Sequence, residues 1–175
     1  MSFDYVSLAP EVQKGLIEAS ALQMKVDPII IEKDLWAVLT LQALFDRIHD
    51  YNTYQALTFK GGTSLSKAYQ IIDRFSEDID ITIDRKFLGL QASDEELKTL
   101  SRKQRDKNLE ELKNRGHKFI ETHILPYLKL KLSSFVPKEG IEIRFNTEDL
   151  LSLEIFYPTR LQSTYNSYVK PRIYV

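Results

Sequence analysis

The chain opens with two stretches in which apolar residues recur at helical spacing. The first covers residues 9–22, and the second begins at Asp27 and Pro28 and continues to about residue 48. Asp27 suits the N-cap position, and Pro28 suits the first helical position, where its missing N–H is not needed. The pattern therefore predicts a helical N-terminal part over residues 1–50.

The hydrophobic period changes in the middle of the chain. Residues 56–59 form a short strand candidate, and Gly61 and Gly62 end it as a turn. Residues 78–83 alternate polar and apolar side chains, which is typical of a half-buried strand. Between them we expect a helix from Ser64, with an apolar face made of Leu65, Ala68, Tyr69, Ile72 and Phe75.

The last third of the chain combines one long helix with several strands. Ser93 and Glu96 have the spacing of a capping box, which predicts the start of a charged helix that runs to about residue 122. We expect a solvated helix that packs along one narrow stripe, and the alternative is that its basic residues, among them Arg102, contact RNA. Beyond Pro126 we expect strands at residues 141–145, 151–156 and 168–175. These elements predict an antiparallel or mixed sheet with helices on one side, which is an α+β fold. We expect a single domain, with an α+β core over residues 51–175.

Composition narrows the class of protein. Of the 175 residues, 43 % are hydrophobic and 28 % are charged, which fits a soluble domain with one core. A net charge of −1 indicates no general affinity for nucleic acid, although a local basic patch is compatible with it. The absence of cysteine excludes disulfides and thiolate metal sites. The sequence has neither the pattern of a signal peptide nor an apolar run long enough to span a membrane, so we expect a cytoplasmic protein.

The turn at the two glycines has the composition of a phosphate-binding segment. Gly61 and Gly62 let the backbone approach a ligand closely, and the N–H groups at the start of the following helix favour an anion. Thr63 and Ser64 add hydroxyl groups there, and Lys67 stands one turn further on. These five residues are our candidates for binding a nucleotide.

Two aspartates on the next strand are candidate metal ligands. Asp78 and Asp80 point to the same face, with Cβ atoms roughly 6.5–7 Å apart. Carboxylates at that spacing can hold Mg²⁺ or Mn²⁺, because hard oxygen ligands favour these ions over zinc. An Asp-x-Asp pair alone is more often a solvated strand face. Its position after a strand, a Gly-Gly turn and a helix favours a catalytic metal site.

A kinase-like phosphotransferase is a different class that also uses glycine-rich loops. The chain has no Gly-x-x-x-x-Gly-Lys-Ser/Thr run, and its Asp-x-Asp pair follows the glycines too closely. The sequence therefore argues against this class.

The run FKGGTSLSKAYQIIDRFSEDIDITI, residues 59–83, resembles the signature of the nucleotidyltransferase AbiEii/AbiGii toxin family, within the polymerase-beta-like nucleotidyltransferase superfamily. Gly61 and Gly62 match its glycines, Asp78 and Asp80 match its metal ligands, and Ser64 matches a hydroxyl that meets the triphosphate. Weaker similarity lies at residues 31–36 and 168–175.

The resemblance implies an enzyme with a polymerase-beta-like core. It would use Mg²⁺ to transfer a nucleoside monophosphate from an NTP to an acceptor hydroxyl. The acceptor would be RNA, in particular tRNA, or a protein residue. The resemblance also implies a cognate antitoxin, encoded nearby in a bacterial toxin–antitoxin or abortive-infection (phage-defence) system.

Members of the family usually continue past the strand that resembles residues 168–175. That strand normally leads into an acidic residue and a helical region with a further Lys and Asp, which have no counterpart before Val175. We therefore expect a form shortened relative to the family. The alternative to an active enzyme is an inactive remnant that binds a nucleotide without turnover.

Three further pairs of residues have two interpretations each. Glu142 and Glu154 can supply a third carboxylate, but exposed positions on strands are the expected outcome. Glu32 and Lys33 either lie near the site or form a surface ion pair on a helix. Arg74 and Glu77 either bridge the turn before the aspartates or contact the substrate.

Overall fold

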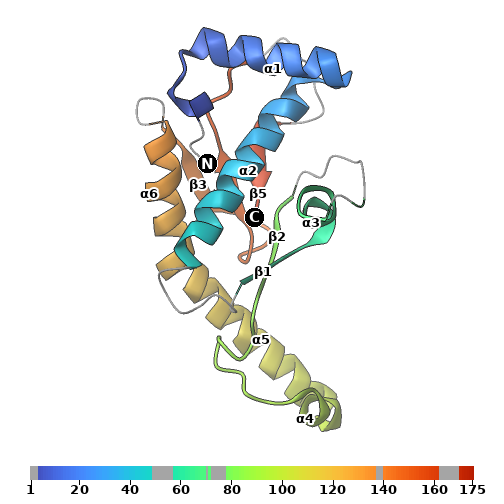
Figure 1. Ribbon diagram of the computed structural model, residues 1–175. Coiled ribbons are helices and arrows are strands. Elements are labelled where there is room, and N and C mark those ends of the chain that lie inside the picture. Colours follow the sequence, from blue (N-terminus) through green and yellow to red (C-terminus); the bar gives the residue numbers. More distant parts are fainter. Residues whose placement is uncertain (1–3, 49–56, 70, 72–77, 137–139, 162–169) are drawn as a thin grey trace.

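The computed structural model describes residues 4–48, 57–69, 71, 78–136, 140–161 and 170–175 (Figure 1). Two short non-α helical segments are η1 (Asp4–Ser7), a 3-10 helix, and η2 (Ile120–Ile124), a π-helix. The α-helices are α1 (Pro10–Met24), α2 (Pro28–Ile48), α3 (Gly61–Lys67), α4 (Asp94–Thr99), α5 (Arg102–Phe119) and α6 (Leu125–Phe135). The strands are β1 (Leu57–Lys60), β2 (Asp80–Ile83), β3 (Glu142–Phe145), β4 (Leu153–Phe156) and β5 (Arg172–Tyr174).

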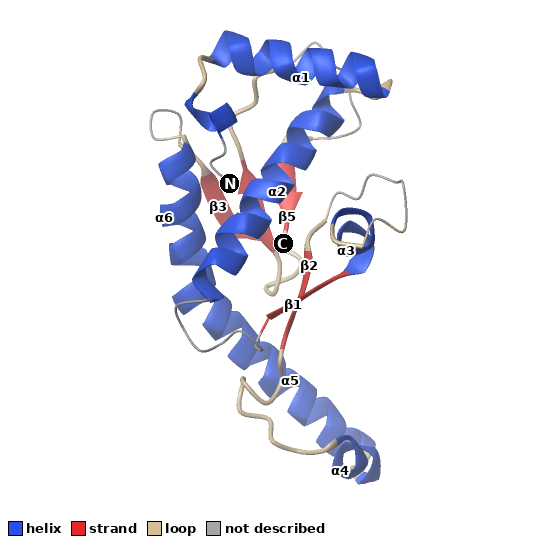
Figure 2. Cartoon of the chain, viewed as in Figure 1, coloured by secondary structure: helices blue, strands red, loops and turns tan. Residues whose placement is uncertain are grey.

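The two N-terminal helices form as the sequence predicts. Pro28 is the first residue of α2, and the Asp27 side chain accepts a hydrogen bond from the Ile29 N–H at 2.9 Å. Lys25 ends α1 in the left-handed conformation, with φ of 56°. The chain then turns sharply, so that α1 lies across the end of α2 (Figure 2).

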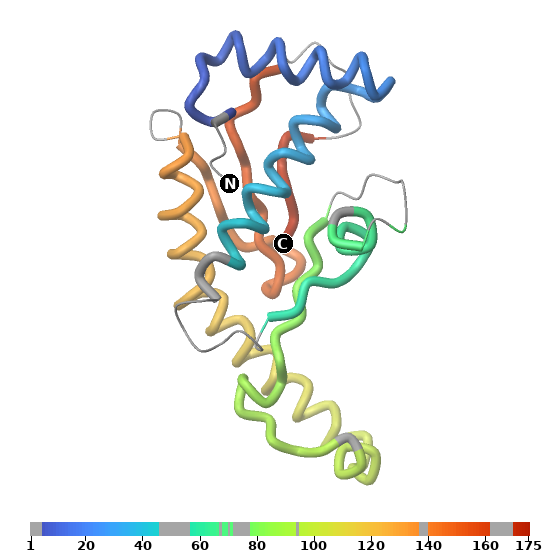
Figure 3. The backbone as a smooth tube through the Cα atoms, viewed as in Figure 1, coloured from blue at the N-terminus to red at the C-terminus, as the bar shows by residue number. Residues whose placement is uncertain are grey.

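The strands form two antiparallel sheets that meet at one point. β1 pairs with β2, while β3, β4 and β5 form a three-stranded sheet in that order. A parallel bridge between Asp78 and Tyr174 links the two sheets, and the Ile79 N–H donates to the Tyr174 carbonyl at 2.9 Å. The chain just before β2 therefore lies beside β5, as the tube in Figure 3 shows. The structure confirms an α+β fold.

The core lies between the three-stranded sheet and the helices α2 and α6. Ile143, Ile155 and Ile173 are paired across the strands and at most 2 % exposed. Leu39 of α2 and Leu128 of α6 are fully buried in the same cluster. This packing covers one face of the sheet and leaves the other face for polar side chains.

The helix after the glycines differs from its prediction. It starts at Gly61 itself and ends at Lys67, instead of running from Ser64 to Phe75. Leu65 and Tyr69, expected on a buried face, are 41 % and 66 % exposed. The prediction was wrong because apolar spacing indicates a helical face but not whether another element covers it. Ile72 and Phe75 lie outside the described residues.

The long charged helix is also divided differently. The capping box at Ser93 and Glu96 is confirmed, but α4 ends at Thr99, and a second box at Ser101 and Gln104 starts α5. The helical path then continues through η2 and α6 to Phe135, whereas we expected the helix to end at about residue 122. Pro126 interrupts the ordinary hydrogen-bond ladder, and the wider π-helical turn before it accommodates this loss.

Among the described residues, no helix has both the length and the apolar character needed to cross a membrane.

Candidate active site

Gly61 brings the backbone against the side chain of Asp80. Lys60 pairs with Asp80 in the β1–β2 ladder, so Gly61 follows directly beside that residue. Its φ of 75° is a left-handed conformation that favours glycine. A Cβ atom at this position would stand only 1.9 Å from Asp80 Oδ2. Glycine at position 61 therefore leaves room for the side chain of Asp80, the candidate metal ligand, and the close approach to a phosphate stays a prediction.

Asp78 is held beside the same turn by backbone contacts on both sides. Its carbonyl accepts a hydrogen bond from the Thr63 hydroxyl of α3, and the bridge to Tyr174 holds it against β5. Asp78 and Asp80 are both exposed, whereas Ile79 between them is 2 % exposed. The predicted alternation is thus present, and the two carboxylates lie on one face.

The aspartates line an open hollow of about 370 Å³ between β2 and the end of β5. Tyr174 and Ser152 contribute polar groups to its wall. A second cavity of about 300 Å³ is lined by Ile81 and Ile83 of β2 and by Leu112 of α5, among other residues. Its lining is almost entirely apolar, so of these two the hollow at the aspartates is the one that suits a charged ligand.

The hydroxyls expected to bind phosphate contact the backbone of the turn. Thr63 is 1 % exposed and holds the carbonyl of Asp78, while Ser64 is 3 % exposed and donates to the Gly61 carbonyl at 2.9 Å. The Thr63 bond therefore links α3 to Asp78, whereas the Ser64 bond lies within the first turn of α3. The side chain of Lys67 lies outside the described part of the structure.

The residues present fit a magnesium ion that is completed by its substrate. In the described ranges, no group of three or more His, Cys, Asp or Glu side chains is placed to hold a metal. Mg²⁺ commonly binds one or two protein carboxylates and takes its other ligands from phosphates and water. Asp78 and Asp80 supply those two carboxylates on an open face, so the donor set is suitable.

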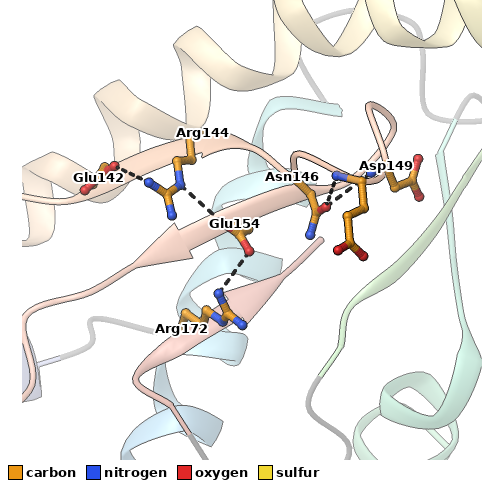
Figure 4. Close-up of polar contacts among 7 residues, drawn as sticks. Glu142, Arg144, Asn146, Asp149, Glu154 and Arg172 are labelled. Carbon is orange, nitrogen blue, oxygen red and sulfur yellow. Dashed lines mark hydrogen bonds and ion pairs between the residues drawn. The ribbon is translucent and has the colours of Figure 1, made fainter.

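Glu154 is not the exposed strand residue that we expected. It is 7 % exposed, and its carboxylate accepts hydrogen bonds from Arg144 Nε at 3.2 Å and Arg172 Nη1 at 3.1 Å. Glu142 is exposed, as expected, and lies 3.5 Å from Arg144 Nη1. Figure 4 shows these four side chains across β3, β4 and β5. The arginines occupy the Glu154 oxygens, which makes it a poor third metal ligand.

Glu32 and Lys33 do not form the surface ion pair that was one interpretation. Their exposed fractions are 1 % and 2 %. The Glu32 carboxylate accepts hydrogen bonds from the Thr159 hydroxyl at 2.6 Å and from the Arg160 N–H at 2.5 Å. Glu32 therefore ties α2 to the segment after β4. Burial raises the pKa of its carboxyl, and the hydrogen bonds from Arg160 and Thr159 oppose this shift.

This raised pKa predicts how stability depends on pH. The folded chain binds the Glu32 proton more tightly than the unfolded chain, so its contribution to the unfolding free energy falls as pH rises from the ordinary carboxyl pKa through the folded value. Glu32→Gln should remove this slope. Denaturant unfolding of both proteins between about pH 4 and about pH 8 measures it.

Glu96 provides a control of opposite sign. Hydrogen bonds from Ser93 lower the pKa of the Glu96 carboxyl, so its stabilising contribution is present above the ordinary pKa and is lost as pH falls. The free energy of unfolding of the wild type minus that of Glu96→Gln should therefore grow with pH. The corresponding difference between the wild type and Glu32→Gln should shrink. If both differences in unfolding free energy changed with pH in the same direction, the raised pKa of Glu32 would be contradicted.

Two side chains near the aspartates were missed in the sequence. Lys60 lies opposite Asp80 on the exposed face, and Tyr174 lies beside Asp78. A strand pairing of 57–60 with 80–83 would have indicated Lys60, since the turn lies between these strands. Tyr174 lies in the run 168–175 that resembles a family strand, but no local pattern places it beside Asp78, because the bridge joins residues nearly 100 positions apart. Arg74 and Glu77 lie outside the described residues.

An α+β domain in which an Asp-x-Asp strand packs on a Gly-Gly turn has the architecture of a nucleotidyltransferase. The family model for the nucleotidyl transferase AbiEii toxin of Type IV toxin–antitoxin systems matches residues 42–172. This range covers well over half of the chain and includes both glycines and both aspartates, and the chain belongs to this family. No curated protein and no solved structure matches it. Membership of a toxin–antitoxin family implies a cognate antitoxin as partner.

Proposed function

We propose that this protein is a Mg²⁺-dependent nucleotidyltransferase toxin. It transfers a nucleoside monophosphate from an NTP to an acceptor hydroxyl on RNA, in particular tRNA, or on a protein. Asp78 and Asp80 are the catalytic metal ligands. Gly61, Gly62, Thr63, Ser64 and Lys67 form the nucleotide-binding turn.

One observation carries this proposal. Asp80 lies so close to Gly61 that no side chain fits between them, and Asp78 lies next to it on the same exposed face. A polyphosphate that contacts the turn would therefore also meet the two carboxylates. Two neighbouring carboxylates repel each other, and a cation bound between them would remove this repulsion. The family match supports the same assignment.

The residues have separate tasks in the transfer. Gly61 and Gly62 allow the backbone to approach the triphosphate, and Thr63 and Ser64 hold the turn rigid. Bound Mg²⁺ would neutralise the phosphates and stabilise the leaving group. The acceptor hydroxyl releases its proton to solvent while its oxygen forms a bond to the α-phosphorus, the bond from that phosphorus to the oxygen that bridges to the β-phosphate breaks, and pyrophosphate leaves. Asp78 and Asp80 orient these reactants across the hollow.

A nucleotide-binding protein without turnover is the second candidate. It is favoured by the pairing of Glu154 with two arginines, which leaves two carboxylates at the site in the described part of the chain. Such a protein would bind NTP and Mg²⁺ at the same hollow.

Incubation of the purified chain with each labelled NTP, Mg²⁺ and total RNA or total protein tests the proposal. We expect label from one NTP to enter an acceptor and EDTA to abolish the transfer. Titration calorimetry with the same NTPs, with and without Mg²⁺, separates the two candidates. Binding without transfer supports the second candidate, and the absence of both refutes the site.

A further inference from the structure

A row of charged and polar side chains continues from the aspartates across the face of the three-stranded sheet opposite α2 and α6. Residues paired across neighbouring strands point to the same face. Asp78 is bridged to Tyr174, Tyr174 pairs with Glu154, and Glu154 pairs with Arg144. Arg172 lies two positions before Tyr174 and therefore shares this face. We call Arg144, Glu154, Arg172 and Tyr174 the arginine row.

The buried carboxylate of Glu154 fixes the two arginines of this row. Its side chain is 9 % exposed, and it receives one hydrogen bond from each guanidinium. Arg172 also stacks over the Tyr174 ring, with its Cζ 4.9 Å from the centroid, and Arg144 lies 4.6 Å over the Phe156 ring. Both guanidiniums thus have defined orientations instead of the freedom of surface arginines.

The guanidiniums remain accessible despite these contacts. The Arg144 side chain is 55 % exposed and the Arg172 side chain is 27 % exposed. A guanidinium has five N–H donors. The contacts with described residues engage Nε and Nη1 of Arg144 and Nη1 of Arg172, so donors remain for a ligand. A fixed and partly exposed guanidinium suits bidentate binding of a phosphate.

The order of the strands separates this row from the nucleotide-binding turn. Gly61 approaches Asp80 from the side of β1, whereas β5, β4 and β3 follow on the other side of Asp78. If the NTP occupies the turn, the side of β5, where Tyr174 and Val175 line the hollow, is left for an acceptor to approach the aspartates. The acceptor would then pass over Tyr174 and the two arginines.

We propose that Arg172 and Arg144 bind backbone phosphates of a polynucleotide acceptor on the β5 side of the aspartates, and that Glu154 is their positioning residue. This inference rests on the proposed function. β3 and β5 flank β4, so their backbones stand roughly 10 Å apart. Two separated and oriented cations match the repeated charges of a nucleic-acid strand, whereas a single hydroxyl of a protein acceptor has no such charge pattern.

Binding of a labelled single-stranded RNA oligonucleotide to the full chain, without NTP, tests the inference by fluorescence anisotropy across a salt series. Arg172→Gln and Arg144→Gln should each weaken binding several-fold at low salt. Each should also make the negative slope of log affinity against log salt shallower by about 0.7, the value for one phosphate contact on a single strand. Arg102→Gln, at a side chain that is 94 % exposed on α5, should change neither.

Two further measurements keep the result clear. Thermal unfolding shows whether the variants fold. If a variant does not fold, wild-type protein is instead cross-linked to an oligonucleotide that contains 4-thiouridine. Cross-links on peptides with Tyr174 or Phe156 support the inference, and cross-links confined to other elements overturn it.

The inference and the proposed function can fail separately. Equal RNA binding by wild type, Arg172→Gln and Arg144→Gln overturns the arginine row, even if transfer to RNA is observed. Label transferred only to protein, by a chain without RNA affinity, overturns it as well but leaves the nucleotidyltransferase intact. RNA binding that depends on both arginines, in a chain that transfers nothing, supports the row and counts against the proposed enzyme.

Discussion

Asp80→Asn is expected to lower nucleotidyl transfer by more than roughly 100-fold while leaving the fold intact. Loss of a residue that merely supports a metal ligand commonly costs 10–100-fold, and Asp80 is proposed as a ligand itself. Asparagine keeps the shape of the side chain but removes its charge, so the cation would be held mainly by Asp78. The site would then bind Mg²⁺ and the triphosphate more weakly.

The fold should not change, because the Asp80 side chain is exposed. Surface substitutions of this kind usually change the unfolding free energy by less than about 0.5 kcal/mol. Asp106→Asn is the matched control, since it makes the same chemical change on an exposed part of α5. Transfer of labelled nucleotide and calorimetric binding of NTP with Mg²⁺ are the two readouts. An Asp80→Asn protein that transfers label at the wild-type rate would remove Asp80 from the mechanism.

Gly61→Ala should also reduce transfer by roughly 100-fold, through displacement of Asp80 rather than loss of its charge. The new Cβ atom would overlap Asp80 Oδ2, so the carboxylate must turn away or the strands must separate. Misplacement of a catalytic group by about 1 Å can cost about 100-fold in rate. The positive φ of Gly61 adds a stability cost of about 1–2 kcal/mol for alanine.

Gly140 separates the two effects of this substitution. Its φ of 73° is nearly that of Gly61, but apart from its own and its chain neighbours' atoms no heavy atom lies within 4 Å of the position of its Cβ. Gly140→Ala should therefore lose similar stability in denaturant unfolding and keep full transfer activity and NTP binding. If both alanine variants retain activity, the contact between Gly61 and Asp80 is not needed for the reaction.

Local signals in the sequence predicted the parts of the site that depend on neighbours in the chain. Asp27 and Pro28 start α2 because capping needs only adjacent residues. The two-residue period places Asp78 and Asp80 on the face opposite Ile79. The glycine turn was found because a bend between a strand and a helix requires a residue without a side chain.

Contacts between distant segments decided everything else. Only the tertiary structure shows that Glu32 accepts hydrogen bonds from Thr159 and Arg160 and that Glu154 lies between two arginines. A charged residue in a sequence suggests exposure, and burial becomes favourable only when such partners compensate for the lost water. The bridge from Asp78 to Tyr174 likewise depends on how two sheets meet, which no local pattern records. The sequence by itself therefore predicted the residues of the proposed site, and the packing of the two sheets decided which side chains surround them.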